Sequence, residues 1–456
     1  MAIQSINPLN GKLVKKYKED TVKATVEKIE AGYKAWLKWR HTSFEQRAGL
    51  LLKTAAVLER QKNDLAILMA TEMGKPLKDG IAEIEKCAAV CTYYARNGAA
   101  FLKDEKVKTD ARNSFVTFQP IGLVLAVMPW NFPYWQCFRF IAPALMAGNT
   151  GLLKHASNVP GCALSIEALL LKAGFPRGVF QTLLVGSKAV NAVIDHPLVK
   201  AVTLTGSTEA GSQVAAQAGR QIKKTVLELG GSDPYIILED ADLELAATVC
   251  AQSRLINNGQ SCIAAKRFIV VKKVEQAFIR LFLEKMRHKK LGDPLDAQTE
   301  LGPMSRADLR DALHRQVQEN IAAGASCILG GNIPAFKGKH AFYAPTILTG
   351  IQKGMSGYEE ELFGPVACVI TARNEAHAIE IANDTRFGLG AAVFTKDIKK
   401  GERIAREQLQ AGACFVNTFV KSDPRVPFGG IHQSGYGREL GSFGIKEFVN
   451  IKTVWR

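Results

Sequence analysis

Residues 201–211 read AVTLTGSTEAG, and this stretch decides the fold class. Its first five residues are apolar or β-branched, which predicts a buried strand, and a helical pattern starts at Ser207. The turn at Gly206 places backbone N–H groups and a helix start at the carboxyl end of a strand, where an anion can bind. A capped turn without a ligand is the alternative, because Thr208 departs from the G-x-G-x-x-G motif.

The same alternation extends along the chain on both sides of this stretch. Nearby strand-like and helical runs alternate at 151–154, 163–173, 180–185, 188–193 and 225–229. A second set of strand-like runs follows at 235–238, 268–271, 365–370, 391–394 and 414–417. Residues 20–104 are helical in pattern. This order predicts βαβ crossovers and buried parallel sheets, so the fold class is α/β, with two domains and an intervening hairpin.

Length, composition and charge narrow the class of protein. The chain has 456 residues, 47% of them hydrophobic, and a formal net charge of +16. No apolar run reaches the ~18 residues of a membrane span, and no secretory signal is visible, so we expect a cytoplasmic protein without a membrane partner. The basic residues occur as dispersed pairs, such as Lys223-Lys224, which argues against a nucleic-acid partner and favours a solvated surface.

The nine cysteines are irregularly spaced, which argues against a disulfide framework. Cys87 and Cys91 are four apart on a predicted helix, a spacing that metal ligands also use. No partner pair of suitable spacing accompanies them, so we expect core packing and no metal.

Three further segments carry residues suited to covalent chemistry. Cys262 lies in the polar stretch 257–267, NNGQSCIAAKR, where a thiol can reach a cleft and act as a nucleophile once it is ionised. Glu228, within LELGG, is a carboxylate between apolar neighbours whose pKa can rise towards that of a base. Asn131, within PWNFP, is a rigidly framed amide suited to an oxyanion. Taken singly, the last two are equally compatible with a rim carboxylate and an aromatic-proline turn.

Together these segments resemble one family, the aldehyde dehydrogenase superfamily. The matching motifs are GQSC around Cys262, LELGG around Glu228, PWNF around Asn131, ELFGP at 361–365 and PFGG at 427–430. They occur in the family's order over nearly the whole chain, and the spacing between Glu228 and Cys262 also matches.

The resemblance implies a role for each matching catalytic residue. Cys262 is the nucleophile, which forms a thiohemiacetal with the aldehyde and then, after hydride transfer to the nicotinamide, a thioester. Asn131 stabilises the oxyanion beside the backbone N–H of Cys262. Glu228 activates the water that hydrolyses the thioester. A relative that acylates coenzyme A is less consistent with the chain, because Glu228 is present to activate water.

It also implies how a dinucleotide is held. Lys154 reaches the adenosine ribose, Gly206 and Ser207 hold the pyrophosphate, and Glu361 and Phe363 hold the nicotinamide ribose and ring. Trp130 and Leu229, which flank the catalytic residues, complete the predicted cofactor-binding set.

The family's fold implies two Rossmann-like α/β domains and an oligomerisation hairpin. On this pattern residues 1–102 and 121–229 form the dinucleotide-binding domain and residues 230–425 the catalytic domain. Residues 103–120 and 426–456 then serve oligomerisation, and we expect a homodimer or homotetramer.

Ser157 bears on the choice between NADP and NAD. Members of the family that prefer NAD often carry Glu at this position, where a carboxylate repels the 2′-phosphate of NADP. Ser157 removes that repulsion and Lys154 supplies a cation, so we expect NADP to be preferred and NAD to be possible. The alternative is a neutral Ser157 that allows both cofactors equally.

Arg139 bears on the substrate. It lies two helical turns after Asn131 and matches the arginine that a bacterial branch of succinate semialdehyde dehydrogenases uses to bind the substrate carboxylate. A second such arginine of some members is Ile256 here, and Ser422, Arg425 or Lys421 could replace it. The sequence therefore predicts oxidation of succinate semialdehyde to succinate.

Three alternatives stay open. Arg139 could instead pair with a surface acid, and the substrate could be another small aldehyde, either another semialdehyde or an uncharged one. The chain could also be a non-catalytic structural relative, which would be free to lose Cys262, Glu228 or Asn131.

Overall fold

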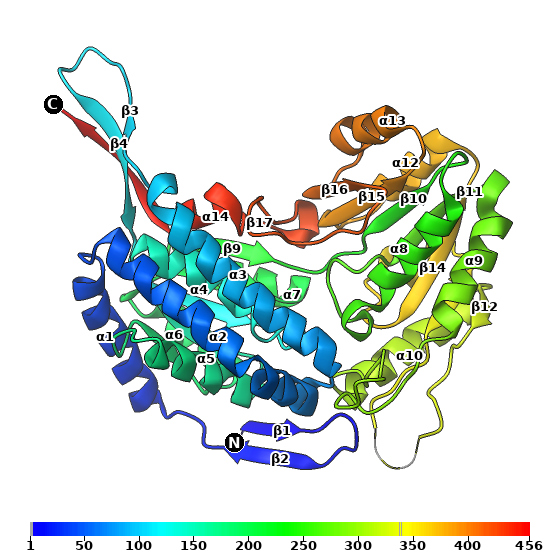
Figure 1. Cartoon of the computed structure of the whole chain (residues 1–456), viewed down its shortest axis with the longest axis horizontal. Coiled ribbons are helices and arrows are strands. Elements are labelled where there is room, and N and C mark those ends of the chain that lie inside the picture. The colour runs from blue at the N-terminus through cyan, green and yellow to red at the C-terminus, as the bar shows by residue number, and fades with distance from the viewer. Residues whose placement is uncertain (1–2, 337, 339) are drawn as a thin grey trace.

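The structure is a computed structural model that describes residues 3–336, 338 and 340–456. Two α/β units lie side by side, and a narrow arm projects from the first (Figure 1). Each unit has its own mostly parallel sheet packed with helices, so the predicted α/β fold is confirmed.

The first sheet has the strand order β17-β9-β8-β5-β6-β7. Its strands are β5 (Leu123–Met128), β6 (Thr150–His155), β7 (Phe180–Thr182), β8 (Val199–Thr205), β9 (Lys224–Glu228) and β17 (Gly435–Tyr436). All neighbours are parallel except β17, which pairs antiparallel with β9. Strands β5 and β8 are almost entirely buried, as their continuous apolar runs require.

The helices around this sheet are α1 (Val22–Trp39), α2 (Phe44–Met73), α3 (Leu77–Phe101), α4 (Trp135–Ala147), α5 (Pro160–Lys172), α6 (Val190–Asp195) and α7 (Thr208–Arg220). A capping box starts α2: Gln46 N donates to Ser43 Oγ at 3.2 Å, and Ser43 N donates to Gln46 Oε1 at 2.9 Å. α2 and α3 form the layer seen in blue in front of the sheet in Figure 1.

The edge strand β7 is shorter than the predicted run 180–185. Leu184 N donates to Asp20 Oδ2 at 2.9 Å, and Gly186 N donates to Glu19 Oε1 at 2.8 Å. These two carboxylates accept hydrogen bonds from backbone N–H groups that a longer edge strand would present to a further strand. The predicted helix at 188–193 likewise begins with a 3-10 turn, and α6 itself starts at Val190.

The second sheet has the strand order β12-β13-β14-β11-β10-β15-β16, in which only the β12–β13 pair is antiparallel. The strands are β10 (Pro234–Ile237), β11 (Arg267–Val271), β12 (Ser326–Leu329), β13 (Thr346–Thr349), β14 (Val366–Ala372), β15 (Gly390–Phe394) and β16 (Ala413–Val416). Its helices are α8 (Leu243–Leu255), α9 (Glu275–Arg287), α10 (Ala307–Ala322), α11 (Ser356–Glu359), α12 (Glu375–Asn383) and α13 (Ile398–Arg403).

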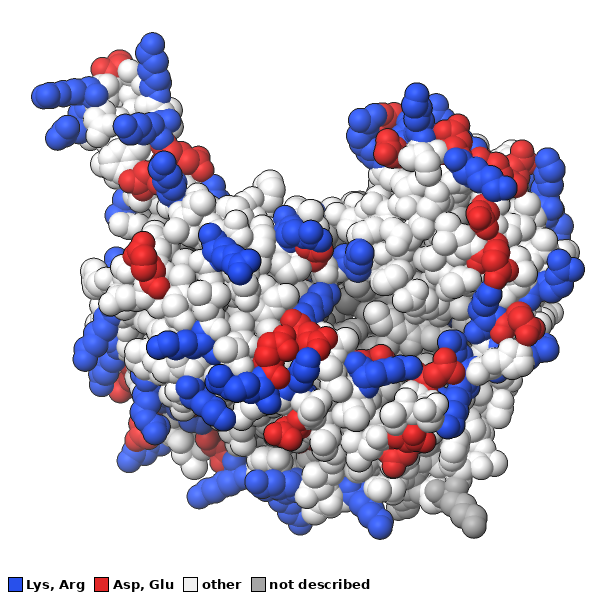
Figure 2. Space-filling view, in the orientation of Figure 1, with Lys and Arg blue, Asp and Glu red and all other residues white. Residues whose placement is uncertain are grey.

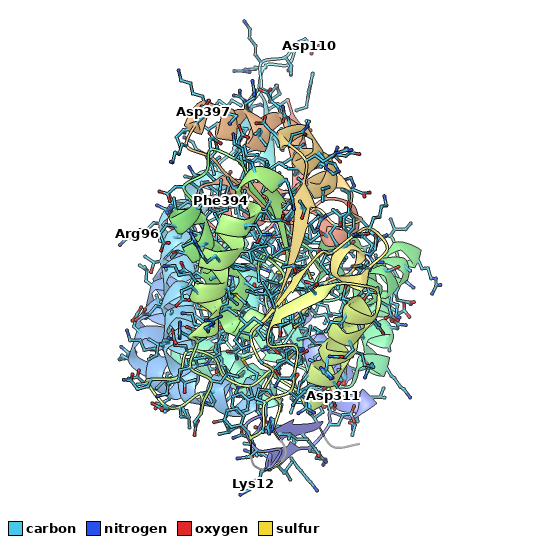
Figure 3. All side chains as sticks on the ribbon, turned by 90° about the vertical axis from the view of Figure 1, so that its right-hand side faces the viewer. Lys12, Arg96, Asp110, Asp311, Phe394 and Asp397 are labelled. Atoms are coloured by element: carbon cyan, nitrogen blue, oxygen red, sulfur yellow. The ribbon has the colours of Figure 1, made fainter. Side chains whose placement is uncertain are left out.

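The arm is a three-stranded antiparallel sheet of order β18-β4-β3. It combines β3 (Glu105–Lys106) and β4 (Ser114–Pro120) with the C-terminal strand β18 (Val449–Trp455). Figure 3 shows Asp110 at its tip, at the opposite end of the molecule from Lys12 of the hairpin β1 (Ile3–Ile6)–β2 (Leu13–Tyr17). Residues 426–456 therefore contribute to two places, because β17 joins the first sheet, and α14 (Gly441–Lys446) follows it before β18.

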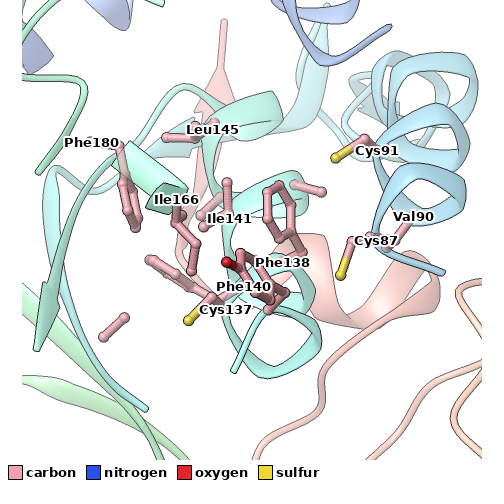
Figure 4. Close-up of a cluster of buried hydrophobic side chains, with 14 of the residues drawn as sticks. Cys87, Val90, Cys91, Cys137, Phe138, Phe140, Ile141, Leu145, Ile166 and Phe180 are labelled. Carbon is pink, nitrogen blue, oxygen red and sulfur yellow. The ribbon is translucent and has the colours of Figure 1, made fainter. Parts of the chain in front are cut away.

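A large apolar cluster surrounds α4. Cys87, Val90 and Cys91 of α3 face the side chains of α4, among them Phe138 (Figure 4). Burial raises the pKa of both thiols, and both are fully sealed from solvent. Across residues 3–336, 338 and 340–456, no group of three or more His, Cys, Asp or Glu side chains is placed to hold a metal ion.

The surface charge is dispersed. In Figure 2 Lys and Arg side chains are scattered over the face shown and interspersed with Asp and Glu. In the part of the chain that the structure describes, no helix is long and apolar enough to cross a membrane.

Candidate active site

The loop that carries Cys262 is a strained turn at the end of α8. A 3-10 turn (Ile256–Gly259) follows the helix, and within it Asn257 (φ 53°) and Asn258 (φ 57°) adopt the left-handed conformation that asparagine tolerates best among non-glycine residues. Gly259 has φ 75°, and a Cβ there would lie 2.3 Å from the carbonyl carbon of Gly364. The glycine is therefore required by both its conformation and its close contact.

Two buried cations hold the carbonyl groups of this loop. Arg254 donates from Nη1 to Ala265 O at 2.9 Å and from Nη2 to Gly259 O at 2.5 Å. Lys266 Nζ donates to Ser261 O at 2.9 Å, to Cys262 O at 2.7 Å and to Ala264 O at 3.2 Å. The backbone on both sides of Cys262 is thus fixed by charge-assisted hydrogen bonds.

Cys262 itself is half-buried. Burial raises the pKa of its thiol to about 12, while the nearby cations Arg139 and Lys266 act in the opposite direction. Glu361 and Glu228 add to the rise, because negative charge disfavours the thiolate. The thiol is therefore protonated at neutral pH in this arrangement, and added positive charge in the pocket would activate it.

Asn131 lies directly against the nucleophile loop. Its side-chain Nδ2 donates to Gln260 O at 3.1 Å, and Asn257 Nδ2 donates to Asn131 O at 2.7 Å. The side chain is 4% exposed. An amide has two N–H donors, and only one is used by the Gln260 carbonyl, so the second is available for an oxyanion.

Glu228 is the last residue of β9 and is sealed from solvent, with 2% of its surface exposed. Neither carboxyl oxygen has a hydrogen-bond partner among the described residues. Burial raises the pKa of Glu228 well above its usual value, and the neighbouring carboxyl of Glu439 raises it further. A Cβ at Gly429 would lie 2.7 Å from Oε1, so a glycine there leaves room for the carboxyl. These features suit a carboxyl group that acts as a base.

Arg139 lies on α4 beside this carboxyl. Its guanidinium is 2% exposed, stacks 4.8 Å above the ring of Phe428, and has Nε 2.7 Å from Glu439 Oε2. That contact does not have hydrogen-bond geometry, and within the described chain Nε and Nη2 have no hydrogen-bond partner. Arg139 also acts electrostatically on Cys262 and Glu228, so the structure brings it to the catalytic residues. Its partner is a buried acid rather than the surface acid that was the alternative.

The predicted nicotinamide residues come from three separate loops, and two contacts join them to each other or to the loop that carries Cys262. Glu361 accepts a hydrogen bond from Gly231 N at 3.2 Å, and Oε1 lies 3.2 Å from Lys266 Nζ. Trp130 and Phe363 meet edge to face, with their ring centroids 5.8 Å apart. Leu229 is buried one residue after Glu228 and donates its N–H to Ser434 O at 3.0 Å.

The predicted adenosine residues lie at the carboxyl ends of β6 and β8. Lys154 is the penultimate residue of β6, and within the described residues its half-buried ammonium forms no hydrogen bond or ion pair. Burial lowers the pKa of Lys154. Gly206 follows β8, and exposed Ser207 caps α7 by accepting from Ala210 N at 3.2 Å. An unpaired ammonium and a helix N-terminus fit the phosphates and ribose of a dinucleotide.

A cleft of about 590 Å³ opens beside this end of the sheet. Exposed Ser157 and its neighbour Asn158 line one side, together with Gly186 after β7. The other side includes Ile3 of the N-terminal hairpin and Arg306 before α10. Ser157 therefore faces open space large enough for part of a cofactor.

The three candidate substrate-binding residues at 421–425 differ in burial. Ser422 is buried and accepts hydrogen bonds from Trp135 Nε1 at 3.1 Å and from Lys86 Nζ at 2.9 Å. Arg425, in contrast, is 77% exposed and forms a forked ion pair with Asp423, so the structure does not bring it to Cys262. Lys421 is also exposed.

Two charged side chains that act on the candidate catalytic residues were not predicted from the sequence, Lys266 and Glu439. Lys266 belongs to the quoted 257–267 stretch, where an ammonium close to Cys262 was a visible signal. Glu439 belongs to no motif used above, and the only signal for it was that a buried Arg139 requires a compensating charge.

Comparisons with known proteins agree on one family. The family model described as the aldehyde dehydrogenase family matches residues 1–454. A probable succinate-semialdehyde dehydrogenase [NADP(+)] of Synechocystis sp. is 49% identical over all of both chains. A succinate-semialdehyde dehydrogenase [NADP(+)] of Mycolicibacterium paratuberculosis is 48% identical over the whole chain and 97% of the relative.

A solved structure is similar over its full length. The succinic semialdehyde dehydrogenase of Streptococcus pyogenes, in complex with NADP+, superposes with a TM-score of 0.97. It is 37% identical, and all of both chains is covered.

Proposed function

The chain belongs to the aldehyde dehydrogenase family, and from that premise we propose that it oxidises succinate semialdehyde to succinate with NADP as the preferred cofactor. The family predicted from the five motifs is confirmed. The observation that carries the proposal is that Glu228 and Arg139 both act electrostatically on Cys262, while Asn131 donates to the carbonyl group two residues before it.

Cys262 is proposed as the nucleophile. Its thiolate adds to the aldehyde carbon, and the second N–H of the Asn131 amide stabilises the oxyanion of the thiohemiacetal that forms. Arg139 and Lys266 lower the pKa of the thiol against the effect of burial. The hydrogen bonds from Lys266 fix the carbonyl groups around Cys262, so the nucleophile does not have to be reoriented during the reaction.

Oxidation converts the thiohemiacetal into a thioester on Cys262. The oxidised nicotinamide supplies the hydride acceptor when it is bound. Lys154, Ser157, Gly206 and Ser207 are proposed to hold the adenosine end, and Trp130, Leu229, Glu361 and Phe363 the nicotinamide end. The lack of a partner for the Lys154 ammonium among the described residues supports the first group.

Glu228 is proposed as the base that activates the water molecule for hydrolysis of the thioester. Its carboxylate takes a proton from a water molecule, the resulting hydroxide adds to the thioester carbonyl, and the Cys262 thiolate leaves as succinate is released. The raised pKa of Glu228 makes its carboxylate a stronger base towards water.

Arg139 supports a substrate that carries a carboxylate. Two nitrogens of this buried guanidinium have no hydrogen-bond partner in the described chain, although Nε is ion-paired with Glu439, and such a group can bind carboxylate oxygens. Another small aldehyde is the second candidate, because Glu439 already compensates the charge of Arg139.

Membership of the family also supports a proposal for the domains and the assembly. We propose that residues 1–102 and 121–229 bind the dinucleotide, that residues 230–425 are the catalytic domain, and that the arm mediates a homodimer or homotetramer. Ile451 and Trp455 on β18 support the last point, because these apolar side chains are 63% and 57% exposed. We further propose a cytoplasmic enzyme without nucleic-acid or membrane partners, which the dispersed charge supports.

One panel of assays tests the proposed function. Succinate semialdehyde, longer semialdehydes and butanal are each supplied with NADP or NAD, and formation of reduced cofactor is measured by absorbance. The expected result is the highest kcat/KM for succinate semialdehyde with NADP. A higher kcat/KM for an uncharged aldehyde, or with NAD, would reject that part of the proposal.

A further inference from the structure

Lys86 of α3 has its ammonium held between two side chains next to the proposed site. Nζ donates to Ser422 Oγ at 2.9 Å and lies 4.2 Å from the ring centroid of Trp135. Trp135 Nε1 donates to the same Ser422 oxygen at 3.1 Å. Three distant segments therefore converge on one buried hydroxyl.

The hydroxyl of Ser422 has a donor to spare. A serine oxygen has two acceptor positions and one O–H. Lys86 and Trp135 occupy both acceptor positions, so the O–H is left to donate to a further group. A cation next to a free O–H donor is an arrangement that suits a carboxylate, which only accepts hydrogen bonds.

The charge of Lys86 is not matched by any ion pair in the described part of the chain. The acid of its own helix that acts on Lys86 is Glu83, which pairs with Lys75 and accepts from Tyr134 N and Trp135 N at 2.9 Å each. That carboxylate is therefore engaged in capping α4.

The other groups that act on Lys86 also leave it without a counterion. Asp423 accepts two hydrogen bonds from the guanidinium of Arg425, so its charge is already paired. Cys87 is a buried thiol. Arg139 on α4 is a second cation and repels it. Burial and Arg139 together lower the pKa of Lys86 to about 8.

A pocket of about 180 Å³ lies beside this ammonium, several times the ~30 Å³ that a water molecule occupies. Its wall includes Lys86, Trp135, Phe132 and Asn257. Two acids also line it, Glu83 and Asp79, and burial raises the pKa of Asp79, which favours its uncharged form. Asn257 is the residue whose side chain contacts Asn131, so the pocket adjoins the nucleophile loop. Ile256, where some relatives carry a second carboxylate-binding arginine, lines the same pocket.

We propose that Lys86, with Ser422, is the second carboxylate-binding group of this enzyme and replaces the arginine absent at Ile256. The cation comes from α3 instead of from the nucleophile loop. The inference rests on the proposed function, because it assigns the carboxylate of the same substrate. Bound carboxylate also relieves the repulsion between Lys86 and Arg139, since it places a negative charge near two cations.

The alternative is that Lys86 only packs against Trp135. Lys86→Met distinguishes the two, because methionine keeps the length and the packing on the indole but loses the charge. Lys86→Arg keeps the charge, and Lys78→Met removes an exposed lysine from the same helix as a matched control.

The measured quantity is the ratio of kcat/KM for succinate semialdehyde to kcat/KM for butanal, in which a methyl group replaces the carboxylate. Loss of a charged hydrogen-bond partner is expected to lower this ratio about tenfold to a hundredfold in Lys86→Met, mostly through KM. Lys86→Arg should recover much of the loss, and Lys78→Met should retain the wild-type ratio. Thermal unfolding confirms that each variant is folded.

The two proposals fail in different ways. If the wild type does not prefer succinate semialdehyde to butanal, the proposed function fails. If the wild type has the preference and folded Lys86→Met keeps it, the assignment of Lys86 alone is overturned.

A pH profile gives a readout that a packing role would not affect. Lys86 loses its charge as the pH rises through about 8, so the wild-type ratio should fall above that pH. Titration of Cys262 and Glu228 affects both aldehydes and cancels in the ratio. The fall should disappear in Lys86→Arg, because a guanidinium keeps its charge. A wild-type ratio that stays constant from pH 7 to about 9.5 would contradict the assignment.

Discussion

Lys266 Nζ lies 3.2 Å from Glu361 Oε1 and forms with it a largely buried ion pair that joins the nucleophile loop to the predicted nicotinamide residue. The same ammonium donates to the carbonyl of Cys262. One side chain thus connects the two halves of the proposed chemistry, the nucleophile and the cofactor.

Lys266→Met should destabilise the protein and should also slow the reaction of the Cys262 thiol with an alkylating agent. Removal of one partner from a buried ion pair costs about 3–5 kcal/mol, and the lower end applies because Glu361 is 20% exposed. Loss of the nearby cation raises the pKa of Cys262, so alkylation by iodoacetamide at pH 8 should be slower. Urea unfolding and the alkylation rate measure the two effects. Lys273→Met, at a 74% exposed lysine, is the control and should change neither.

Cys262→Ala should abolish turnover, because no other group is proposed to form the thioester. The variant should stay folded, since the lost sulfur is only half-buried. Cys327→Ala is the matched control, at a half-buried cysteine on β12 of the second sheet, and should retain activity. Residual steady-state formation of reduced cofactor by Cys262→Ala would disprove the nucleophile assignment.

Asn131→Ala should lower kcat about 10²–10³-fold, the typical effect of losing one oxyanion donor. The loop should keep its shape, because Asn257 Nδ2 still donates to Gln260 O at 3.0 Å. Steady-state kinetics and the melting temperature separate the two effects. A variant with near-wild-type kcat would remove Asn131 from the mechanism.

Glu228→Gln should trap the enzyme after one turnover. Without the base the thioester accumulates, so a burst of reduced cofactor should be followed by a slow phase. In the wild type, the rate of deacylation should rise with pH through the raised pKa of Glu228, because only the ionised carboxylate accepts a proton from water. Rapid-mixing kinetics at several pH values measure both effects.

The same substitution should stabilise the protein at neutral pH. A carboxyl whose pKa is raised on folding binds its proton more tightly in the native state, so its contribution to stability is fully present below the unfolded pKa of about 4.3. This contribution is lost as the pH rises through the folded pKa. A neutral glutamine does not lose this contribution. In urea unfolding, Glu228→Gln should therefore have a higher free energy of unfolding than the wild type at pH 8, and the two should be equally stable below pH 4. A lower stability at pH 8 would contradict the raised pKa.

Ser157→Glu should shift the cofactor preference towards NAD. A carboxylate on the wall of the 590 Å³ cleft repels the 2′-phosphate of NADP, which carries about two negative charges. The ratio of kcat/KM for NADP to that for NAD should fall at least tenfold. Ser326→Glu, at an exposed serine on β12, adds the same charge elsewhere and should leave the ratio as it is.

The sequence predicted the interior of the first sheet well. The runs at 151–154, 201–205 and 225–229 form β6, β8 and β9 with boundaries shifted by no more than two residues. Central strands are buried on both faces, and this requirement leaves a continuous apolar signal. The edge strand β7 was overestimated because its last amide groups bond to carboxylates that are distant in sequence, and local pattern carries no information on such partners.

Short motifs in the sequence predict the roles of Cys262, Glu228 and Asn131, and these roles stay predictions. The sequence did not predict the charged side chains whose contacts are made with residues far away in sequence. Lys86 lies in a helix of ordinary pattern, and only the folded chain places it against Ser422, 336 residues away. Arg425 had the right chemistry in sequence, but its neighbour Asp423 holds it at the surface.

The pairing of β17 with β9 has a consequence for the order in which the protein is made. Gly435 is the partner of Glu228 across the strands, and Ser434 Oγ donates to Gly230 O, a contact between residues 204 positions apart. The strand that carries Glu228 therefore stays at an open sheet edge until residues 435–436 have been synthesised. Such a long loop closes slowly, and an unpaired edge is prone to aggregation while it waits. Truncation before residue 435 should thus give an insoluble product as well as an inactive one.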